Sequence, residues 1–381
     1  MTTLGDVMVT RGGSVKPSDF PDEEFELYSI PAHDRGGPEI ALGAEIGSSK
    51  QIVQPGDVMV SKIIPHIRRA RVVGQLAGRR QIASGEWIVF RGSAFDPAYL
   101  RHFLLSDGFH SQFMNTVAGV GGSLVRARPA HVKSIALPVP PLPEQRRLAA
   151  ILDHADTLRS KRGQVLARVD SLTQSIFHDM FGAQSTAQRV ELNQMASVVT
   201  KGTTPTTVGL NFSKAGVPFL RAQNLQRGTV AFAKDDLYIP TAAHETLKRS
   251  WIEPGDLLIS IAGTIGRVAL VPAGSMTMNC NQAVAIVRLR SPEVAPWLLA
   301  WLNSADAKAQ IGASAVTATI SNLSLGQIRQ LKVPAVSDHA VEVFVERSAA
   351  VSAKQAILAK AVSATDELFA SLQSRAFRGE L

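Results

Sequence analysis

The chain has little of what would place it outside the cell or in a membrane. It contains one cysteine, Cys280, which excludes a disulfide framework and a cysteine-rich zinc site. No basic stretch leading into an apolar segment follows Met1, and no apolar run approaches the roughly 18 residues that span a bilayer. The sequence therefore predicts a cytoplasmic protein without a membrane partner.

Motifs for catalysis are also missing from the 381 residues. There is no Asn/Asp-Pro-Pro-Phe/Tyr tetrad of an amino-methyltransferase and no Gly-x-x-x-x-Gly-Lys-Ser/Thr phosphate loop of an ATP motor. The nine histidines lack the spacing of a zinc site, and the glycines at 119, 121 and 122 resemble a dinucleotide loop by composition only. We expect a non-catalytic chain that holds no metal or cofactor of its own.

Charged residues make up only 19% of the chain, yet they sum to +8. Segment 186–334 contributes +6 and segment 1–140 contributes +2, whereas 141–185 and 335–381 are nearly neutral at +1 and −1. A positive excess on an ordinary globular composition indicates a polyanionic partner, with nucleic acid favoured over membrane.

A local concentration of positive charge lies between residues 58 and 95. It contains one acidic residue, Glu86, and seven basic ones: Lys62, Arg68, Arg69, Arg71, Arg79, Arg80 and Arg91. Such a cluster is either a solvated rim on an exposed loop or a face that contacts phosphates. Charge alone leaves both interpretations open.

The sequence repeats itself at a spacing of about 190 residues. Residues 55–61 (Pro-Gly-Asp-Val-Met-Val-Ser) recur at 254–260 (Pro-Gly-Asp-Leu-Leu-Ile-Ser), with four identities. Residues 9–12 match 199–202, and 137–140 match 333–336, so the matches are collinear along the chain. The protein is therefore predicted to be two copies of one unit, each with two parts.

The first part of each copy, 1–140 and 186–334, alternates short apolar runs with glycine and proline. Runs at 57–64, 87–90, 217–220, 256–261 and 283–289 predict strands, and 97–113 and 295–311 predict helices. The expected fold class is α+β, with two repeated mixed α/β globular domains.

The second part of each copy, 141–185 and 335–381, predicts a long helix. From 144 to 181 there is no proline, and apolar residues recur at heptad spacing, which gives a rod of roughly 57 Å. A second amphipathic stretch runs from 340 to 377. Each helix either packs on its own domain or pairs with the other one. An antiparallel pair gives a pseudo-two-fold coiled-coil spacer between two globules.

Two basic globules on a spacer suit a polymer with two recognition sites. Two half-sites that are one helical turn apart on B-DNA are separated by about 34–36 Å. A rod of the predicted length spans that distance. The copies differ in sequence, so a bipartite, asymmetric DNA target is predicted.

The second copy and the start of the first helix resemble a known family. The segments are 200–205 (Thr-Lys-Gly-Thr-Thr-Pro), 217–221 (Val-Pro-Phe-Leu-Arg), 254–260, 263–269 (Gly-Thr-Ile-Gly-Arg-Val-Ala), 281–282 (Asn-Gln) and 137–147 (Leu-Pro-Val-Pro-Pro-Leu-Pro-Glu-Gln-Arg-Arg). Together they resemble the DNA-specificity subunits of type I restriction–modification systems, in family order over essentially the whole chain. The first globule departs at 11–17, and residues 333–339 replace the proline-rich start expected for the second helix.

The resemblance implies two target-recognition domains (1–140 and 186–334) and two spacer helices (141–185 and 335–381). It further implies double-stranded DNA and two methyltransferase subunits as partners, with a restriction or translocase subunit in a full system. S-adenosylmethionine is then expected in the methyltransferase subunit. A methylation complex without a nuclease, and a coiled-coil interaction scaffold without a DNA role, remain alternatives.

Residue types that read bases or phosphates give the candidate DNA contacts. Arg and Lys pair with guanine, and Asn and Gln pair with adenine. The candidates are Lys62, His66, Arg68, Arg69 and Arg71 in the first globule and Lys201, Thr203, Thr204, Arg221, Gln223 and Asn224 in the second. The segment 203–205 is alternatively a turn, and Asn281-Gln282 alternatively a strand cap.

Overall fold

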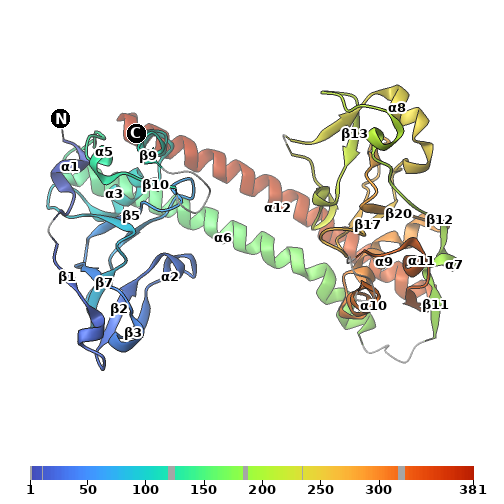
Figure 1. Cartoon of the computed structure of the whole chain (residues 1–381), viewed down its shortest axis with the longest axis horizontal. Helices are drawn as coiled ribbons and strands as arrows, with labels where there is room; N and C mark the ends of the chain where they lie inside the picture. The colour runs from blue at the N-terminus through green and yellow to red at the C-terminus, as the bar shows by residue number, and fades with distance from the viewer. Residues whose placement is uncertain (1, 11, 119–124, 183–187, 234, 316–321) are drawn as a thin grey trace. The chain divides into compact units, whose positions relative to one another are not determined.

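The computed structural model describes residues 2–10, 12–118, 125–182, 188–233, 235–315 and 322–381. The chain forms two compact units, Met1–Gln164 with Lys360–Leu381, and Val165–Ala359 (Figure 1). The division falls within both long helices, so each helix contributes one segment to each unit.

The first unit holds short strands and helices before the first long helix. Its elements are α1 (Leu4–Val7), β1 (Ser14–Val15), β2 (Glu24–Tyr28), α2 (Ile30–Asp34), β3 (Glu39–Leu42), β4 (Lys50–Ile52), β5 (Val58–Ser61), β6 (Ala70–Val72), β7 (Arg80–Ala83), β8 (Trp87–Phe90), α3 (Pro97–Leu104), α4 (Asp107–Met114), β9 (Val117–Ala118), β10 (Arg126–Ala127) and α5 (Pro129–Val132). The long helix α6 (Leu142–Phe181) follows.

The second unit has the same general order of elements. They are β11 (Arg189–Glu191), α7 (Leu192–Met195), β12 (Ala196–Lys201), β13 (Val217–Leu220), β14 (Leu225–Gln226), β15 (Gly228–Val230), β16 (Leu237–Ile239), α8 (Thr241–Thr246), β17 (Leu257–Ser260), β18 (Val268–Leu270), β19 (Asn279–Cys280), β20 (Val284–Leu289), α9 (Ala295–Leu302), α10 (Ala305–Ala315), α11 (Leu325–Arg329) and β21 (Lys332–Pro334). The long helix α12 (Asp338–Arg378) follows.

The repeat seen in the sequence is also a repeat of strand pairing. In the first unit β5 lies between β6 and β8, both antiparallel to it. In the second unit β17 lies between β18 and β20 in the same way. The six-stranded sheet of the second unit has the order β12-β20-β17-β18-β15-β14. The strands at 87–90 and 217–220 have the predicted bounds, and those at 57–64, 256–261 and 283–289 are shorter than predicted.

The Pro-Gly-Asp motif forms the same turn in both units, with an exposed proline and a buried aspartate. Gly56 and Gly255 adopt φ of 85° and 86°, in the left-handed region that favours glycine. The carboxylate of Asp57 accepts two hydrogen bonds from Arg91, at 2.7 and 2.6 Å. Asp256 accepts two from Arg288, at 2.8 and 2.9 Å. The aspartate that precedes each central strand is therefore tied to an arginine of the neighbouring segment: Arg91, directly after β8, or Arg288, within β20.

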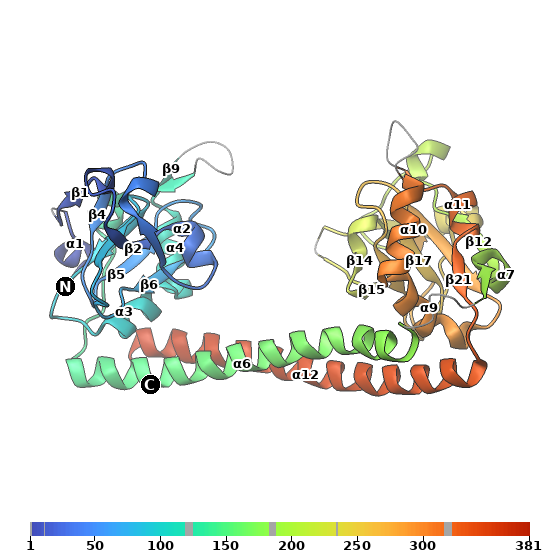
Figure 2. The same cartoon turned by 90° about the horizontal axis from the view of Figure 1, so that it is seen from below.

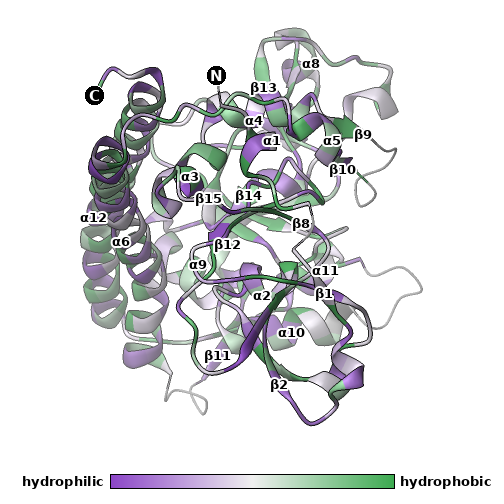
Figure 3. Ribbon diagram, turned by 90° about the vertical axis from the view of Figure 1, so that its left-hand side faces the viewer, coloured by the Kyte–Doolittle hydropathy of each residue, from purple (hydrophilic) through white to green (hydrophobic). Residues whose placement is uncertain are grey.

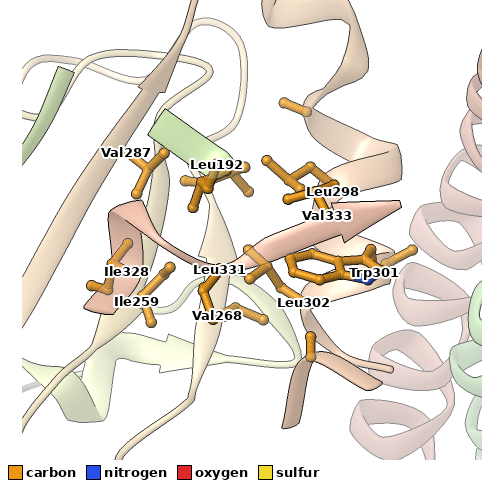
Figure 4. Close-up of a cluster of buried hydrophobic side chains, with 14 of the residues drawn as sticks. Leu192, Ile259, Val268, Val287, Leu298, Trp301, Leu302, Ile328, Leu331 and Val333 are labelled. Carbon is orange, nitrogen blue, oxygen red and sulfur yellow. The ribbon is translucent and has the colours of Figure 1, made fainter. Parts of the chain in front are cut away.

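The core of the second unit packs α9 and α11 on the central sheet (Figure 4). Leu298, Trp301 and Leu302 of α9 lie in one buried cluster with Ile259 and Val268 of the sheet. The segment 295–311 was predicted as one helix but divides into α9 and α10 at Ser304, whose hydroxyl accepts a hydrogen bond from the Ala307 amide at 3.3 Å.

The predicted helix 97–113 of the first unit divides in the same way. Ser106 accepts a hydrogen bond from the Phe109 amide at 3.2 Å and begins α4. A serine hydroxyl satisfies a free amide at a helix start, so it favours a new helix over continuation of the old one. The sequence predicts one helix over each segment because a serine that caps a new helix is indistinguishable there from an ordinary helical residue.

The long helices α6 and α12 confirm the predicted rods within a few residues at each end. In the first unit their segments pack antiparallel: Arg147 donates to the Leu381 carbonyl at 2.8 Å and Arg162 donates to Thr365 (Figures 1 and 2). In the second unit Gln355 donates to Asp170 at 3.0 Å, and the rings of Phe177 and Phe344 meet edge to face. Hydrophilic and hydrophobic residues alternate along both helices (Figure 3).

Two negative findings apply to the part of the chain that the structure describes. No helix there is long and apolar enough to cross a membrane. Nor do three or more His, Cys, Asp or Glu side chains come together among those residues as ligands for a metal ion.

Candidate nucleic-acid interface

Three loops meet at one end of the central sheet in the second unit. Lys201, the last residue of β12, pairs with Ala285 near the start of β20, and Ser260, the last residue of β17, pairs with Val284. Antiparallel pairing therefore places residues 202–204, 261–267 and 281–283 together. We call these three loops, with Lys201, the second loop end.

Gly202 holds two of these loops in close contact. Its amide donates to the Val284 carbonyl at 3.0 Å, and the next amide, of Thr203, donates to the Cys280 carbonyl at 3.0 Å. A Cβ atom at position 202 would lie 2.1 Å from the Cys280 carbonyl oxygen and 2.2 Å from that of Asn281. Only glycine allows this approach, which explains the glycine of the Lys-Gly-Thr-Thr-Pro segment.

The turn that precedes β20 presents an exposed glutamine. The Val284 amide donates to the Asn281 carbonyl at 3.2 Å, which closes a turn with Gln282 as its second residue. The Asn281 side chain accepts from the Ala283 amide at 3.2 Å, so it shapes the turn. The Thr204 hydroxyl donates to the Gln282 side-chain oxygen. Thr204 and Gln282 thus tie the first and third loops together through their side chains.

The 261–267 loop is anchored on the buried Ser260. Its hydroxyl donates to the Thr264 carbonyl at 2.5 Å and accepts from the Arg267 amide at 2.8 Å. The side chains of Lys201 and Arg267 are exposed at this end of the sheet. Arg249 lies beside them, because its Nε donates to the Thr200 hydroxyl at 3.2 Å. The second loop end therefore combines fixed backbone with two cationic side chains, Lys201 and Arg267, and Arg249 adds a third beside it.

The remaining predicted contacts of the second globule are divided between surface and interior. The Gln223 side chain is exposed, whereas Asn224 is only 3% exposed. The Asn224 amide nitrogen donates to the Ala231 carbonyl at 2.9 Å and to Asp236 at 2.8 Å. Arg221 donates to the Asp235 carbonyl at 3.0 Å. Burial and these bonds give Asn224 a structural role in its loop instead of a surface one.

The first unit has a matching loop end. Ser61, the last residue of β5, pairs with Trp87 at the start of β8, and β6 begins at Ala70. Residues 62–69 and 84–86 therefore gather at one end of that sheet, and we call them the first loop end. His66 is exposed there and Lys62 is half-buried. In the described part of the chain, the Lys62 ammonium group has no ion-pair or hydrogen-bond partner.

The cluster of basic residues between 58 and 95 is largely neutralised by carboxylates from other segments. The ion pairs are Arg68 with Asp107, Arg69 with Asp34, Arg79 with Glu24, Arg80 with Glu23, and Arg91 with Asp57. The concentrated charge in the sequence is therefore not a concentrated charge on the surface. Neither the solvated rim nor the continuous phosphate face describes this segment.

Arg69, the last residue of the 62–69 loop, and Arg71 of β6 pack against α2. Arg69 is 8% exposed and donates to both carboxylate oxygens of Asp34, at 2.6 and 2.8 Å. Arg71 donates to His33 Nδ1 at 3.0 Å and to the Gly36 carbonyl at 2.8 Å. Burial and the charge of Arg71 lower the pKa of His33, which favours the neutral ring that is able to accept this bond. Both arginines hold the sheet to α2.

Arg68 differs from these two because its ion pair is exposed. It lies 2.6 Å from Asp107, whose side chain is 79% exposed. Exposed ion pairs contribute only about 0–1 kcal/mol to stability, so Arg68 is able to exchange Asp107 for another anion.

The glycines at 119, 121 and 122 lie outside the described residues.

Sequence reasoning did not select three residues that the structure places at or beside the second loop end. Arg249 is distant in sequence from the other loops. Arg267 was recognised only as part of a family motif, and Gln282 only as part of a family motif or as a strand cap. The spacing of Arg267 and Gln282 from the Pro-Gly-Asp motif, which leads into the central strand β17, was the available signal.

Comparison with known proteins gives a partial sequence match and full-length structural matches. No family model matches the sequence. The type I restriction enzyme EcoDI specificity subunit of Escherichia coli is 27% identical over 182 residues, which is 45% of this chain and 39% of that protein. The match thus spans well under half the length of that relative.

Two solved structures share the fold over nearly the whole chain. One, from a study of complex assembly in a type I R-M system, has a TM-score of 0.62 at 19% identity and covers 100% of this chain and 97% of its own. The other, a type I restriction–modification S subunit from M. genitalium, has a TM-score of 0.56 at 12% identity, with coverage of 98% and 95%. The predicted α+β fold class, with its long helices, is confirmed, as is the sequence resemblance to a specificity subunit.

Proposed function

We propose that this chain is the DNA-specificity subunit of a type I restriction–modification methyltransferase complex. Each globular part, 1–140 and 186–334, reads one half of a bipartite target, and the helical segments 141–185 and 335–381 set the gap between the halves. The chain itself performs no catalysis. S-adenosylmethionine binds to the methyltransferase partner, and the complex works in the cytoplasm.

The observation that carries this proposal is the pair of matching loop ends. Each lies at the end of a central strand with the same strand pairing, but the residues there differ: half-buried Lys62 with exposed His66 and Arg68 in the first, and exposed Lys201, Arg267 and Gln282 in the second. A common scaffold with different exposed side chains is what two different half-sites require. The match to the EcoDI specificity subunit supports the assignment.

The long helices supply the spacer in this proposal. A helix of 40 residues is about 60 Å long, which is more than one 34–36 Å turn of B-DNA. The antiparallel packing of α6 and α12 segments within each unit supports a pseudo-two-fold spacer. The gap between half-sites then depends on helix length and not on the loops.

The helices also offer surface to protein partners. In the first unit Ile151, Ala155, Leu158, Leu368 and Leu372 line a groove of about 450 Å³ between α6 and α12. Leu368 is 57% exposed, and Leu172, its equivalent 196 residues earlier, is 43% exposed in the second unit. Exposed apolar side chains at equivalent positions favour two copies of one partner. We assign these positions to two methyltransferase subunits; a restriction or translocase subunit joins in a full system.

Replacing Leu172 with aspartate, or Leu368 with aspartate, is expected to release one of the two methyltransferase subunits from the complex. The new carboxylate would be buried without a partner at an apolar contact, which is strongly unfavourable. Native mass spectrometry of the co-purified complex should show one methyltransferase per chain for each single variant and none for the double variant.

The matched controls place the same charge on the far side of each helix. Ala167→Asp on α6 and Ser352→Asp on α12 alter exposed positions well over a quarter turn away from the leucines. Both controls should keep two methyltransferases. Two bound subunits in Leu172→Asp and Leu368→Asp would contradict the assigned docking surface.

Replacing Lys201 with alanine is expected to weaken DNA binding in a salt-dependent manner. If its ammonium group neutralises one phosphate, the slope of log K against log salt should flatten by about one unit. Fluorescence anisotropy of the purified complex with duplex DNA measures this slope. Lys354→Ala removes an exposed charge from α12 and should leave the slope unchanged; an unchanged slope in Lys201→Ala itself would remove that residue from the interface.

Co-expression with the cognate methyltransferase subunit tests the proposed function as a whole. Sequencing of genomic methylation should find a bipartite motif that appears only when this chain is present. The alternative interaction scaffold predicts no new methylation and no salt-sensitive binding to duplex DNA. That result, with an active methyltransferase, would overturn the proposal.

A further inference from the structure

Arg249 lies beside the second loop end but outside the segments that resemble the specificity-subunit family. In the second globule those segments stop at residue 221 and resume at 254, so residues 222–253 lie between them. A base contact that is specific to this chain has to come from a part that its relatives do not share. Among the three cationic residues at or beside this loop end, only Arg249 meets that condition.

The backbone on both sides of Arg249 is held by buried neighbours. Before it, the Leu247 carbonyl accepts a hydrogen bond from the buried Asn279 side chain at 3.1 Å. After it, the Trp251 ring stacks on His244 with centroids 4.8 Å apart. The Trp251 indole nitrogen also donates to the His244 carbonyl at 2.7 Å. Position 249 therefore projects from a short segment that is fixed at both ends.

The guanidinium group is oriented and keeps its terminal donors. Its Nε donates to the hydroxyl of Thr200, on the outer strand β12, at 3.2 Å. Arg249 is exposed, and in the described residues its two terminal nitrogens have no hydrogen bond and no ion pair. Arg288, by contrast, is bound by the Asp256 carboxylate. A planar fork with free donors matches the O6 and N7 acceptors of guanine in the major groove.

We propose that Arg249 is a specificity-determining residue that reads a guanine in the half-site of the second globule, and that Thr200 positions it. This inference rests on the proposed DNA-reading function. Thr200, Lys201 and Arg267 belong to the family-like segments, so they supply what any target needs: an orienting hydroxyl and two phosphate contacts. Arg249 adds the contact that depends on the base. Because the bond to Thr200 restricts the arginine before binding, less conformational entropy is lost on contact.

The first globule has a different group at the equivalent position. Alignment of the two Pro-Gly-Asp motifs, 199 residues apart, places Lys50 opposite Arg249. Lys50 is half-buried in β4, and its ammonium group donates to the Ser48 carbonyl at 2.9 Å and to the Ser48 hydroxyl at 2.6 Å. An ammonium group bound in this way lacks the planar fork of arginine. The guanine contact therefore belongs to one half-site only.

Methylation rates of the purified complete complex test the inference. The substrates are duplexes that carry each of the four base pairs in turn at each position of the motif. The wild type should prefer G·C at one position by at least about tenfold, and Arg249→Ala should reduce that preference to less than about threefold. Arg249→Gln should change the preference at that position to A·T, because an amide pairs with adenine N6 and N7. All other positions should remain unchanged.

Thr200 variants separate positioning from a structural role. Thr200→Val removes the hydroxyl at nearly constant shape and should lower discrimination at the same position, whereas Thr200→Ser retains the hydroxyl and should preserve it. Arg290→Ala is the matched control. Arg290 is exposed and directly follows β20 at the opposite end of the same sheet, so its removal should leave every position unchanged.

A phosphate contact by Arg249 would give a different result. An arginine that binds only phosphate lowers the affinity for all duplexes by the same factor and contributes about one unit to the salt slope. Equilibrium binding to the same set of duplexes distinguishes the two roles even if the Arg249→Ala complex methylates slowly. A uniform loss of affinity, with base discrimination intact, would overturn the assignment.

The outcomes also separate this inference from the function on which it rests. If the wild-type complex methylates no bipartite motif, the proposed function fails. If the wild type methylates such a motif and Arg249→Ala discriminates equally well at every position, the function stands and the role of Arg249 is refuted.

Discussion

Replacing Asp256 with alanine destabilises the second unit by about 3 kcal/mol in our expectation. Asp256 is fully buried, and its carboxylate accepts two bonds from Arg288 and one from the Glu253 amide, at 2.8 Å. Removal of one partner of a buried pair costs about 3–5 kcal/mol. The lower value applies because the Arg288 side chain is 29% exposed and regains some hydration.

The single cysteine provides a local measurement of this effect. Cys280 is fully buried in the second unit, and burial raises the pKa of its thiol, so it reacts with a disulfide reagent only after opening. A loss of about 3 kcal/mol should raise the labelling rate roughly a hundredfold where opening is a rapid pre-equilibrium.

An exposed carboxylate in the same unit serves as the control. Asp235 is 72% exposed and forms only a 3.5 Å ion pair with Arg221, so Asp235→Ala should change the labelling rate less than threefold. Equal labelling rates in Asp256→Ala and the wild type would show that the buried lock contributes little. Asp57→Ala removes the equivalent lock of the first unit and should lower its thermal stability comparably.

Replacing Gly202 with alanine is the second large effect that we expect. The added Cβ would meet the Cys280 and Asn281 carbonyl oxygens at 2.1 and 2.2 Å, and both belong to backbone. The 202–204 and 281–283 loops must therefore separate, which displaces Thr203, Thr204 and Gln282 together. A misplaced contact surface should cost about 2 kcal/mol of DNA affinity, or roughly thirtyfold.

The change in affinity is measured as binding of the purified complex to a DNA duplex that carries its methylation motif. Gly312→Ala is the control: it adds the same methyl group to α10, where nothing lies within 4 Å, and should bind DNA as the wild type does. Tight binding by Gly202→Ala would show that the close approach of the loops is not required for recognition. Circular dichroism checks that both variants remain folded.

The sequence predicted the repeat, the fold class and both long helices because these depend on local patterns. A Pro-Gly-Asp turn before a buried run has one common solution, a tight turn into a central strand, and it occurs twice. The helices follow from long stretches with apolar periodicity and no proline. The division into four functional segments was also drawn from the sequence and remains a proposal.

The interface was harder to predict because it depends on which side chains the fold brings together. The sequence left open whether the arginines between 58 and 95 form a solvated rim or a phosphate-contacting face, because it does not show that Asp34 and Asp107 lie beside them. Asn224 was read as a base contact for the same reason, although it is buried and bonds its own loop. Residue type indicates what a side chain is able to bind, whereas burial decides whether it is available.

The central claim is that each globular part reads one half of the target independently. Methylation sequencing of a chimaera tests it most directly, with residues 186–334 replaced by the corresponding segment of another specificity subunit. We predict a motif in which one half changes while the other half and the gap length stay the same. A chimaeric complex that is active but changes both halves, or neither, would contradict the account.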